Sequence, residues 1–406
     1  MFVAAGHQML GATGKMSLVL PRALLSGVAW KDTRLLLGNN YHVKYIVVSH
    51  QPGSWNFSEN TELSECLIVA DWVGPEHTQK PTTVVNLWTK PTSSVEALTV
   101  AALLRGAVGA SLDDPSGTQE LRTEKLKFGE IVQVPAAEIR KGNWNEGAAF
   151  AQTELARVAH FLLQGRVTAP GRGVIGKIPL TKLKAIADIG PDRRDIHDGF
   201  NPTDQTTEYP AVWGHDTTTV QCLAQRPNKY LMALARAKRG RNLRDAHLLW
   251  TRSGRLLVAE RLWLTTTRLV AIRTSEKVLS NTWWPVATDA LDKVLALWFN
   301  CSLGLLSLIA ARVDTRGAWI DLKKPILEEL PVLDASKLSK DSHRKLSEAY
   351  DELAKLEIQA LPQIVGDVVR ARIDKAVADA LGLKDDLSLL RMLLGAEPII
   401  SMHLPA

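Results

Sequence analysis

The sequence predicts an α/β protein in three parts: a partial α/β sheet, an irregular α+β region and a helical tail. Short runs rich in β-branched residues alternate with helical patterns over the first 110 residues. Short apolar runs broken by glycine and proline fill residues 151–335, and a charged helix with one apolar stripe follows. A chain of 406 residues, 46% of them hydrophobic, can bury the cores of two or three such domains.

The first 110 residues show the pattern of a Rossmann-like sheet, in which strands alternate with helices. We expect strands at 16–20, 43–48, 66–70 and 82–87, and helices at 23–38 and 95–104. A region of this length holds only the later strands of such a sheet. The earlier half of the domain is therefore expected to lie outside it.

Changes of composition divide the remainder of the chain. A loop at 106–117, which contains Asp113-Asp114-Pro115, ends the first domain at about residue 110. Residues 111–150 are expected to be a connector, residues 151–335 an α+β domain, and residues 336–406 a helical tail. In the tail we expect a first helix that ends near residue 361 and two further helices at 368–381 and 387–394.

Composition excludes several other classes of protein. Cys66, Cys222 and Cys301 lie far apart, with no ligand partner at suitable spacing, so we expect neither a disulfide scaffold nor a metal site. No secretory signal pattern stands near the N-terminus, which favours the cytoplasm. Residues 294–311 carry no formal charge, but polar residues such as Asn300 favour a buried helix over a membrane span.

Residues 45–71 hold the most informative pattern in the chain. Two apolar, strand-like runs, 45–50 (Tyr-Ile-Val-Val-Ser-His) and 63–71 (Leu-Ser-Glu-Cys-Leu-Ile-Val-Ala-Asp), enclose an aromatic, amide-rich loop. The loop, 55–61, reads Trp-Asn-Phe-Ser-Glu-Asn-Thr. Two strands around such a loop suit the holding of a flat polar ring.

Three upstream features complete the pattern: Gly14, the run 17–21 that ends in Leu-Pro, and Arg34 near the end of the expected helix. In this order the elements of residues 14–72 resemble the end of the catalytic domain of DNA adenine-N6 methyltransferases. The large members of that family, which are fused to restriction or phage-defence systems, are the most similar. Several linked elements make this resemblance more specific than one short motif.

The resemblance implies a reaction and a way of holding its substrate. Such enzymes transfer a methyl group from S-adenosylmethionine to N6 of an adenine in double-stranded DNA, and the base must leave the duplex. By resemblance, Phe57 packs against the extruded adenine, while Asn56 and Asn60 shape the loop or meet polar atoms of the base. The alternative is that Phe57 is a core residue under a tight turn.

The motifs that this family uses for cofactor binding and catalysis do not precede Gly14. They are a glycine-rich turn and an Asn/Asp-Pro-Pro-aromatic sequence, and Asn201-Pro202-Thr203 lacks the second proline and the aromatic residue. We therefore assign no catalytic residue and expect an incomplete S-adenosylmethionine site. Either a second polypeptide supplies the N-terminal catalytic half, or the chain is a non-enzymatic DNA-recognition module or a fragment of a decayed gene.

The run 171–177 (Gly-Arg-Gly-Val-Ile-Gly-Lys) matches a dinucleotide-binding string and most of a phosphate-loop pattern. Ile178 stands where a phosphate loop needs serine or threonine, and Pro170 and Pro179 interrupt the strand, loop and helix that such a site requires. The sequence therefore predicts a glycine-rich surface loop. Contact between its backbone amides and DNA phosphates is the alternative.

The most basic segment of the chain spans residues 226–261. It carries ten basic residues against Asp245 and Glu260, a net charge of +8 compared with +6 for the whole chain. The basic residues predicted to bind DNA are Arg226, Lys229, Arg236, Lys238, Arg239, Arg241, Arg244, Arg252, Arg255 and Arg261. The alternative is the solvated face of an amphipathic helix over residues 229–244.

Together these features predict the C-terminal part of a site-specific DNA adenine-N6 methyltransferase. Residues 1–110 would close the catalytic domain, and residues 151–335 would be the DNA target-recognition domain. On its own the chain is expected to bind DNA rather than to catalyse methyl transfer.

Overall fold

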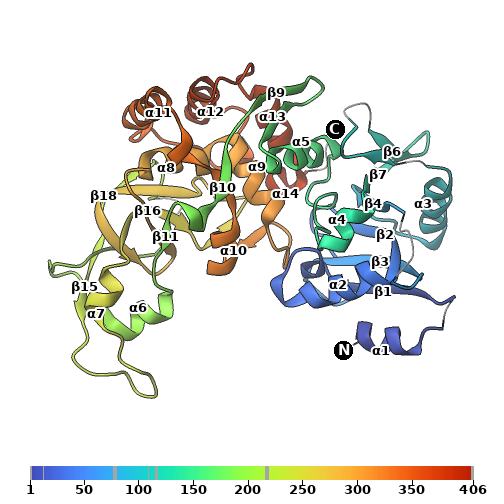
Figure 1. The fold of residues 1–406 in the computed structure, drawn as a ribbon, viewed down its shortest axis with the longest axis horizontal. Helices are drawn as coiled ribbons and strands as arrows, with labels where there is room; N and C mark the ends of the chain where they lie inside the picture. Colours follow the sequence, from blue (N-terminus) through green and yellow to red (C-terminus); the bar gives the residue numbers. More distant parts are fainter. Residues whose placement is uncertain are drawn as a thin grey trace.

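The computed structural model describes residues 2–11, 13–75, 80–107, 109–114, 118–214 and 219–403. Figure 1 shows two lobes: the first sheet with its helices makes one, and the second sheet makes the other. The C-terminal helices run along both lobes, so the chain end lies beside the first lobe. The combination of helices with several sheets confirms the predicted α/β class.

The first lobe is built on a seven-stranded sheet with the order β1-β3-β2-β4-β7-β5, in which β6 also pairs with β7. Strand β3 is antiparallel to both β1 and β2, and β2 is parallel to β4. The strands are β1 (Lys15–Pro21), β2 (Tyr41–Ser49), β3 (Glu65–Trp72), β4 (Thr82–Leu87), β5 (Ala110–Ser111), β6 (Gln119–Arg122) and β7 (Lys127–Val134). The strands expected in this region are all present, because their β-branched runs supply the buried faces of the sheet.

The sheet continues beyond residue 110, where the sequence suggested its end. Because β7 pairs with β4 along its length, the expected connector at 111–150 contains strands of this sheet. The helix expected at 23–38 is divided into η1 (Arg22–Leu25), η2 (Val28–Trp30) and α2 (Lys31–Asn40). Short 3₁₀ turns allow the adjacent Leu24 and Leu25 both to reach the core.

Apolar clusters cover both faces of the first sheet. Helix α3 (Ser94–Gly106) packs on one face over a cluster that includes Val85, Leu87 and Phe128. Helices α4 (Ala136–Lys141) and α5 (Thr153–Leu163) contribute to the main core, which continues into the second lobe. The N-terminal helix α1 (Phe2–Met9) adds Val3 to the same core.

The second lobe contains an eight-stranded sheet with the order β11-β19-β16-β18-β13-β15-β12, in which β14 also pairs with β18. Its strands are β11 (Asp188–Ile189), β12 (Phe200–Thr203), β13 (Pro210–Val212), β14 (Ala224–Gln225), β15 (Lys229–Ala233), β16 (Gly254–Ala259), β18 (Ala271–Ser280) and β19 (Trp283–Ala287). Helices α6 (Arg193–Gly199) and α7 (Ala246–Trp250) pack on its β12–β15 end. Three two-stranded ribbons pair β8 (Arg166–Ala169) with β9 (Gly173–Lys177), β10 (Leu180–Lys182) with β21 (Pro331–Leu333), and β17 (Arg261–Trp263) with β20 (Trp319–Asp321).

The uncharged stretch at 294–311 forms buried helices, as expected, but there are two of them. Helices α8 (Asp292–Asn300) and α9 (Ser302–Ala311) meet at a bend of 74°. A side chain on Gly304 would place its Cβ 1.8 Å from the Trp298 carbonyl oxygen, so only glycine permits this bend. Within the described ranges no single helix is long and apolar enough to cross a membrane. Helices α8 and α9 reach that length and apolar character only when the two are counted as one segment.

The C-terminal region is helical, as the sequence predicted. After α10 (Lys324–Glu329) it contains α11 (Lys340–Leu353), α12 (Val368–Ala380), α13 (Ser388–Ala396) and α14 (Pro398–Ser401). Helix α11 packs against α8 and α12, and α13 packs against α5 and α9. The tail therefore contacts both lobes.

A buried cluster of charges joins the two lobes at a contact that we call the seam. Arg22, directly after β1, lies 2.8 Å from Asp314, which also accepts a hydrogen bond from Arg312 at 2.8 Å. The arginines donate to carbonyl oxygens in the segment after α4: Arg22 to Ala148 at 2.6 Å and Arg312 to Ala149 at 2.8 Å. Burial opposes ionisation of Asp314, but the two arginines outweigh it and hold its pKa below the usual value.

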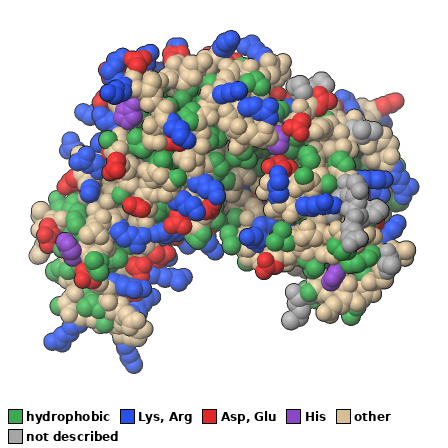
Figure 2. Space-filling model, viewed as in Figure 1, with side chains coloured by type: hydrophobic (Ala, Val, Ile, Leu, Met, Phe, Trp, Pro, Cys, Tyr) green, Lys and Arg blue, Asp and Glu red, His purple; other side chains and the backbone are tan. Residues whose placement is uncertain are grey.

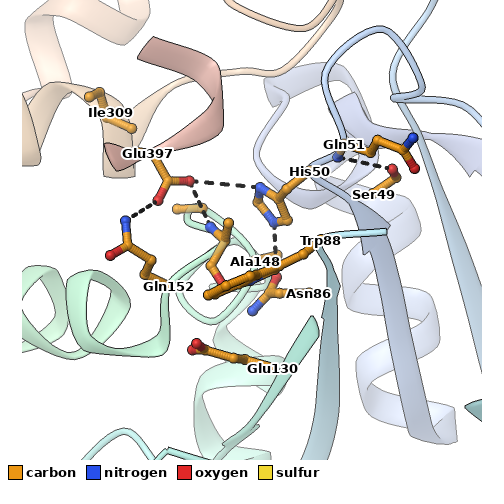
Figure 3. A network of polar contacts seen from close by, with 12 residues as sticks. Ser49, His50, Gln51, Asn86, Trp88, Glu130, Ala148, Gln152, Ile309 and Glu397 are labelled. Carbon is orange, nitrogen blue, oxygen red and sulfur yellow. Dashed lines mark hydrogen bonds and ion pairs between the residues drawn. The ribbon is translucent and has the colours of Figure 1, made fainter. Parts of the chain in front are cut away.

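A second buried group extends the seam to the C-terminal helices (Figure 3). Glu397 accepts hydrogen bonds from the Ala151 amide at 2.7 Å and from the Gln152 side chain at 3.2 Å. Its carboxylate also lies 3.9 Å from His50, whose other ring nitrogen contacts the Asn86 side-chain oxygen at 3.1 Å. Burial raises the pKa of Glu397 to about 7 and lowers that of His50 well below its usual value.

Replacing Asp314 by Ala should lower the free energy of unfolding by about 3–5 kcal/mol, because it leaves two buried arginines without their carboxylate. Urea denaturation followed by circular dichroism measures this change. Asp379→Ala is the control, since its pair with Lys375 lies at the surface and should matter little. Equal stability of the two variants would show that the cluster does not hold the lobes together.

Candidate nucleic-acid interface

The basic segment reaches from the end of the second lobe that is remote from the tail, where β15 and α7 lie, to the centre of the second sheet and the cavity beside the first lobe. It comprises β15, a long loop, α7, β16 and β17, so the amphipathic helix considered for residues 229–244 is wrong. The strand β15 forms instead because it pairs with β12 and β13. The loop at 234–245, which we call the basic arm, projects from the lobe in Figure 1. Figure 2 shows Lys and Arg side chains at this tip and beside the hollow between the lobes.

The predicted DNA-binding residues fall into two groups. Four of them are exposed and form no ion pair with another described residue: Arg226, Arg236, Arg239 and Arg255. The others are held by neighbouring groups. Lys229 pairs with Asp204, Arg252 donates to the Ile189 carbonyl at 2.7 Å, and Arg261 lies 3.9 Å from Glu260 and Asp321.

Helix α6 fixes the shape of the basic arm. Asp198 pairs with Arg241 at 2.9 Å, and Asp195 pairs with Arg244 at 3.0 Å. Lys238 donates to the His197 carbonyl at 2.5 Å. These contacts place several cations of the arm along one helix.

The tip of the basic arm is a tight turn. The Arg241 amide donates to the Lys238 carbonyl at 3.0 Å, and Gly240 has a φ of 72°, as expected at the third position of a type II turn. Arg239 therefore occupies the second, outer position of the turn and is exposed. The turn presents this guanidinium at the far end of the lobe.

Sequence reasoning missed two cations beside the arm. Arg193 and Arg194 are exposed on α6, next to the residues that hold the arm, but in the sequence they stand more than thirty positions before it. Burial lowers the pKa of His197, and the charges of Lys238 and Arg193 lower it further. The cations of the arm and of α6 therefore form one positively charged surface around His197.

The loop after β2 is closed by its own polar groups. The Glu65 carboxylate accepts hydrogen bonds from the Phe57 and Ser58 amides, each at 2.7 Å. The Asn56 side chain donates to the Ser58 and Thr61 carbonyls at 3.0 and 2.7 Å. Asn60 is exposed and turns the chain with a φ of 57°.

Phe57 is half-buried and packs on the apolar cluster beneath α3. It does not line the cavity beside the loop, to which Trp55 and Asn56 contribute. The structure therefore places Phe57 under the loop, with its ring toward the core of the first lobe. Trp55 occupies the position open to a ligand, and the sequence analysis did not single it out.

The described residues do not fit the S-adenosylmethionine site that the resemblance implies. The glycine-rich run at 171–177 comprises the end of the β8–β9 turn and strand β9, and the next element is strand β10, so no helix follows it to present amides to a ligand. Asn201 to Thr203 form part of β12, at the edge of the second sheet. We derive no catalytic step through this cofactor.

In the part of the chain that the structure describes, the residues form no metal-binding cluster, and the two buried cysteines are unsuited to thiol chemistry. No three His, Cys, Asp or Glu side chains gather there to hold a metal ion. Burial raises the pKa of both Cys66 and Cys301 to about 12, so these thiols stay protonated at neutral pH.

Comparison with known proteins finds no matching family model and no matching curated protein. Among solved structures, the type IIG restriction endonuclease BpuSI superimposes with a TM-score of 0.41 and 12% identity, over 99% of this chain and 48% of that one. The HsdS subunit from Thermoanaerobacter tengcongensis gives a TM-score of 0.26 and 10% identity, over 96% and 97% of the two chains. The chain thus spans about half the length of BpuSI. Likenesses this weak carry no argument about function.

Replacing Glu65 by Ala should open the loop, because two backbone amides lose a charged acceptor. We expect faster hydrogen exchange at Phe57 and Ser58 and a loss of about 2 kcal/mol in the free energy of unfolding. Hydrogen exchange with mass spectrometry and urea denaturation measure the two effects. Glu59→Ala removes an exposed carboxylate from the same loop and should change neither, and equal exchange in both variants would contradict this account of the loop.

Proposed function

We propose that this chain is the DNA-recognition part of a site-specific DNA adenine-N6 methyltransferase of the restriction-modification or phage-defence type. The observation that carries the proposal is the basic arm, with exposed arginines that form no ion pair with the described residues around them. Arg193 and Arg194 on α6 add to this cationic surface. A projecting arm of arginines suits the phosphates of double-stranded DNA and the guanine edges of its major groove.

The shape of the molecule supports double-stranded DNA as the partner. Figure 2 shows a hollow between the two lobes, with Lys and Arg side chains on the flank of the second lobe. A duplex in this hollow would meet the basic arm on one side and the first lobe on the other. Contacts to phosphates would supply most of the affinity, and contacts to base edges the choice of site.

In this proposal adenine N6 is the position that the complete enzyme would methylate, and the described residues do not complete the site for that reaction. The resemblance of residues 14–72 to the family supports the choice of adenine. The loop that contains Asn56 and Asn60 would form one side of the place where the base is held, while the Phe57 ring supports it from below. In this proposal the chain contributes DNA binding. Without a catalytic partner it would act as a non-enzymatic DNA-recognition module.

Replacing Arg226, Arg236 and Arg239 by Ala should weaken binding of a labelled duplex of about 20 base pairs. Each lost phosphate contact lowers the slope of log K against log salt by about 0.9, so the triple variant should lose about 2 to 3 in slope. Fluorescence anisotropy at several salt concentrations measures both quantities.

The matched control replaces Arg344, Lys345 and Arg372, exposed cations of the helical tail, and removes the same charge. It should change the slope far less, since these residues lie away from the basic arm. If the two triple variants behave alike, general charge rather than these three exposed arginines of the basic segment binds DNA, and the proposal fails.

A second candidate function is a split enzyme, in which another polypeptide supplies the catalytic half. The observation that favours it is the open edge of β1. The Trp72 amide donates to the Gly14 carbonyl, and the Arg22 amide donates to the Ser64 carbonyl. In this register the backbone amides and carbonyls of even-numbered residues of β1 point toward β3. The amides and carbonyls of Ser17 and Val19 therefore point outward, and no described residue binds them.

An open edge of this kind pairs with another strand. In the absence of a partner, we expect the purified chain to self-associate through β1, as measured by light scattering over a range of concentrations. Val19→Pro removes the outward amide and should reduce the association, whereas Val19→Thr keeps it and should not. Association that is insensitive to Val19→Pro would place the contact elsewhere, and a strictly monomeric chain would remove the support for a second polypeptide.

A further inference from the structure

We propose that a cavity between the two lobes takes an unpaired nucleobase of the bound DNA, stacked against Trp55 and Trp263. The inference rests on the proposed DNA binding and adds a place and stacking residues that the resemblance does not supply. The cavity measures about 250 Å³. Its lining includes Trp55, Asn56 and Leu63 from the first lobe and Trp263, Arg316 and Gly317 from the second.

The indole of Trp55 is held in place by the second lobe. Gly317 has a φ of 51°, and a Cβ on it would lie 2.6 Å from Trp55 Nε1, so its backbone lies directly against the ring. The Gly317 amide donates to the Ser64 hydroxyl at 2.9 Å, and the Ser64 amide donates to the Thr315 carbonyl at 3.1 Å. These bonds fix the ring before any ligand arrives.

The indole of Trp263 is also fixed, although 39% of the residue is exposed. It packs edge-to-face on Trp319, with ring centroids 5.6 Å apart and an angle of 63° between the planes. The two residues are paired across the β17–β20 ribbon. An exposed tryptophan held in one orientation is a ready stacking surface.

Polar groups at the cavity can meet the edge of a base. The Asn56 amide nitrogen is used within the loop, but its oxygen accepts no hydrogen bond from a described residue and can accept from an exocyclic amino group. Arg316 pairs with Glu62 at 2.5 Å, and both side chains are largely exposed. An ion pair at the surface exchanges readily for contacts with a ligand.

The basic segment leads directly to the cavity. Arg261 precedes Trp263 by two positions in β17, so their side chains lie on the same face of the strand, and both are exposed. Arg261 pairs with Glu260 and Asp321, each at 3.9 Å, and such ion pairs of an exposed arginine exchange readily for a phosphate. A phosphate contact next to a stacking surface is how proteins hold single-stranded or extruded nucleotides.

The test compares a fully paired duplex of about 20 base pairs with the same duplex carrying one bulged 2-aminopurine. A bulged base is already unpaired, so the cost of extrusion is small. We expect the bulged duplex to bind about tenfold more tightly, with quenching of the 2-aminopurine fluorescence on binding. Trp263→Ala should abolish both the preference and the quenching while affinity for the paired duplex stays within about twofold, and Trp263→Phe should retain part of both.

Trp30→Ala is the matched control, since it removes an indole from the first lobe away from this cavity, and it should behave like the unaltered chain. If the chain binds both duplexes equally and without quenching, the inference is overturned while DNA binding stands. The same holds if Trp263→Ala weakens both duplexes equally, because Trp263 would then contact DNA without holding a base. If neither duplex is bound, the proposed function itself fails.

Discussion

The buried charges of Arg22, Asp314 and Arg312 determine how the two lobes are placed. A buried ion pair stabilises a protein only when its hydrogen-bonding groups find partners. Here the partners come from separate segments: Arg312 donates to Ala149 and to Ile309 at 2.8 and 2.9 Å, and Arg22 donates to Ala148. Each segment is thereby fixed relative to the others. This cluster, together with the core that both lobes share and the bonds between Ser64 and Gly317, gives a defined shape to a cavity whose walls come from both lobes.

The seam also contains two groups whose titration opposes each other. The folded pKa of Glu397, about 7, lies above its usual value of 4.5, so its contribution to stability is complete below pH 4.5 and is lost as the pH rises through 7. The folded pKa of His50 lies below its usual value of 6.5, so its contribution is present above pH 6.5 and is lost as the pH falls. The contact between the lobes is therefore most stable when the carboxyl is protonated and the imidazole is neutral, in mildly acidic to neutral solution.

The sequence predicted those features whose physical cause is local. Strands such as β2 and β4 carry their own β-branched pattern, and the cations of the basic segment are adjacent in the chain. The sequence did not show that β7 completes the first sheet, because strand pairing depends on partners far along the chain. Trp55 and Trp263 stand about two hundred positions apart and meet only through the seam. The α/β class, although confirmed, does not predict which residues line the cavity.

The acidic residues beside the basic arm do not cancel its charge for binding. Asp195 and Asp198 hold Arg244 and Arg241 in ion pairs at the protein surface, and such pairs contribute only about 0–1 kcal/mol. An arginine can therefore leave its carboxylate for a phosphate or a guanine at little cost, while the pair keeps the free arm ordered. The unpaired Arg239 at the turn needs no such exchange. If the arm binds DNA as proposed, its division into free and paired arginines separates general attraction to phosphates from contacts that form only when the duplex is correctly seated.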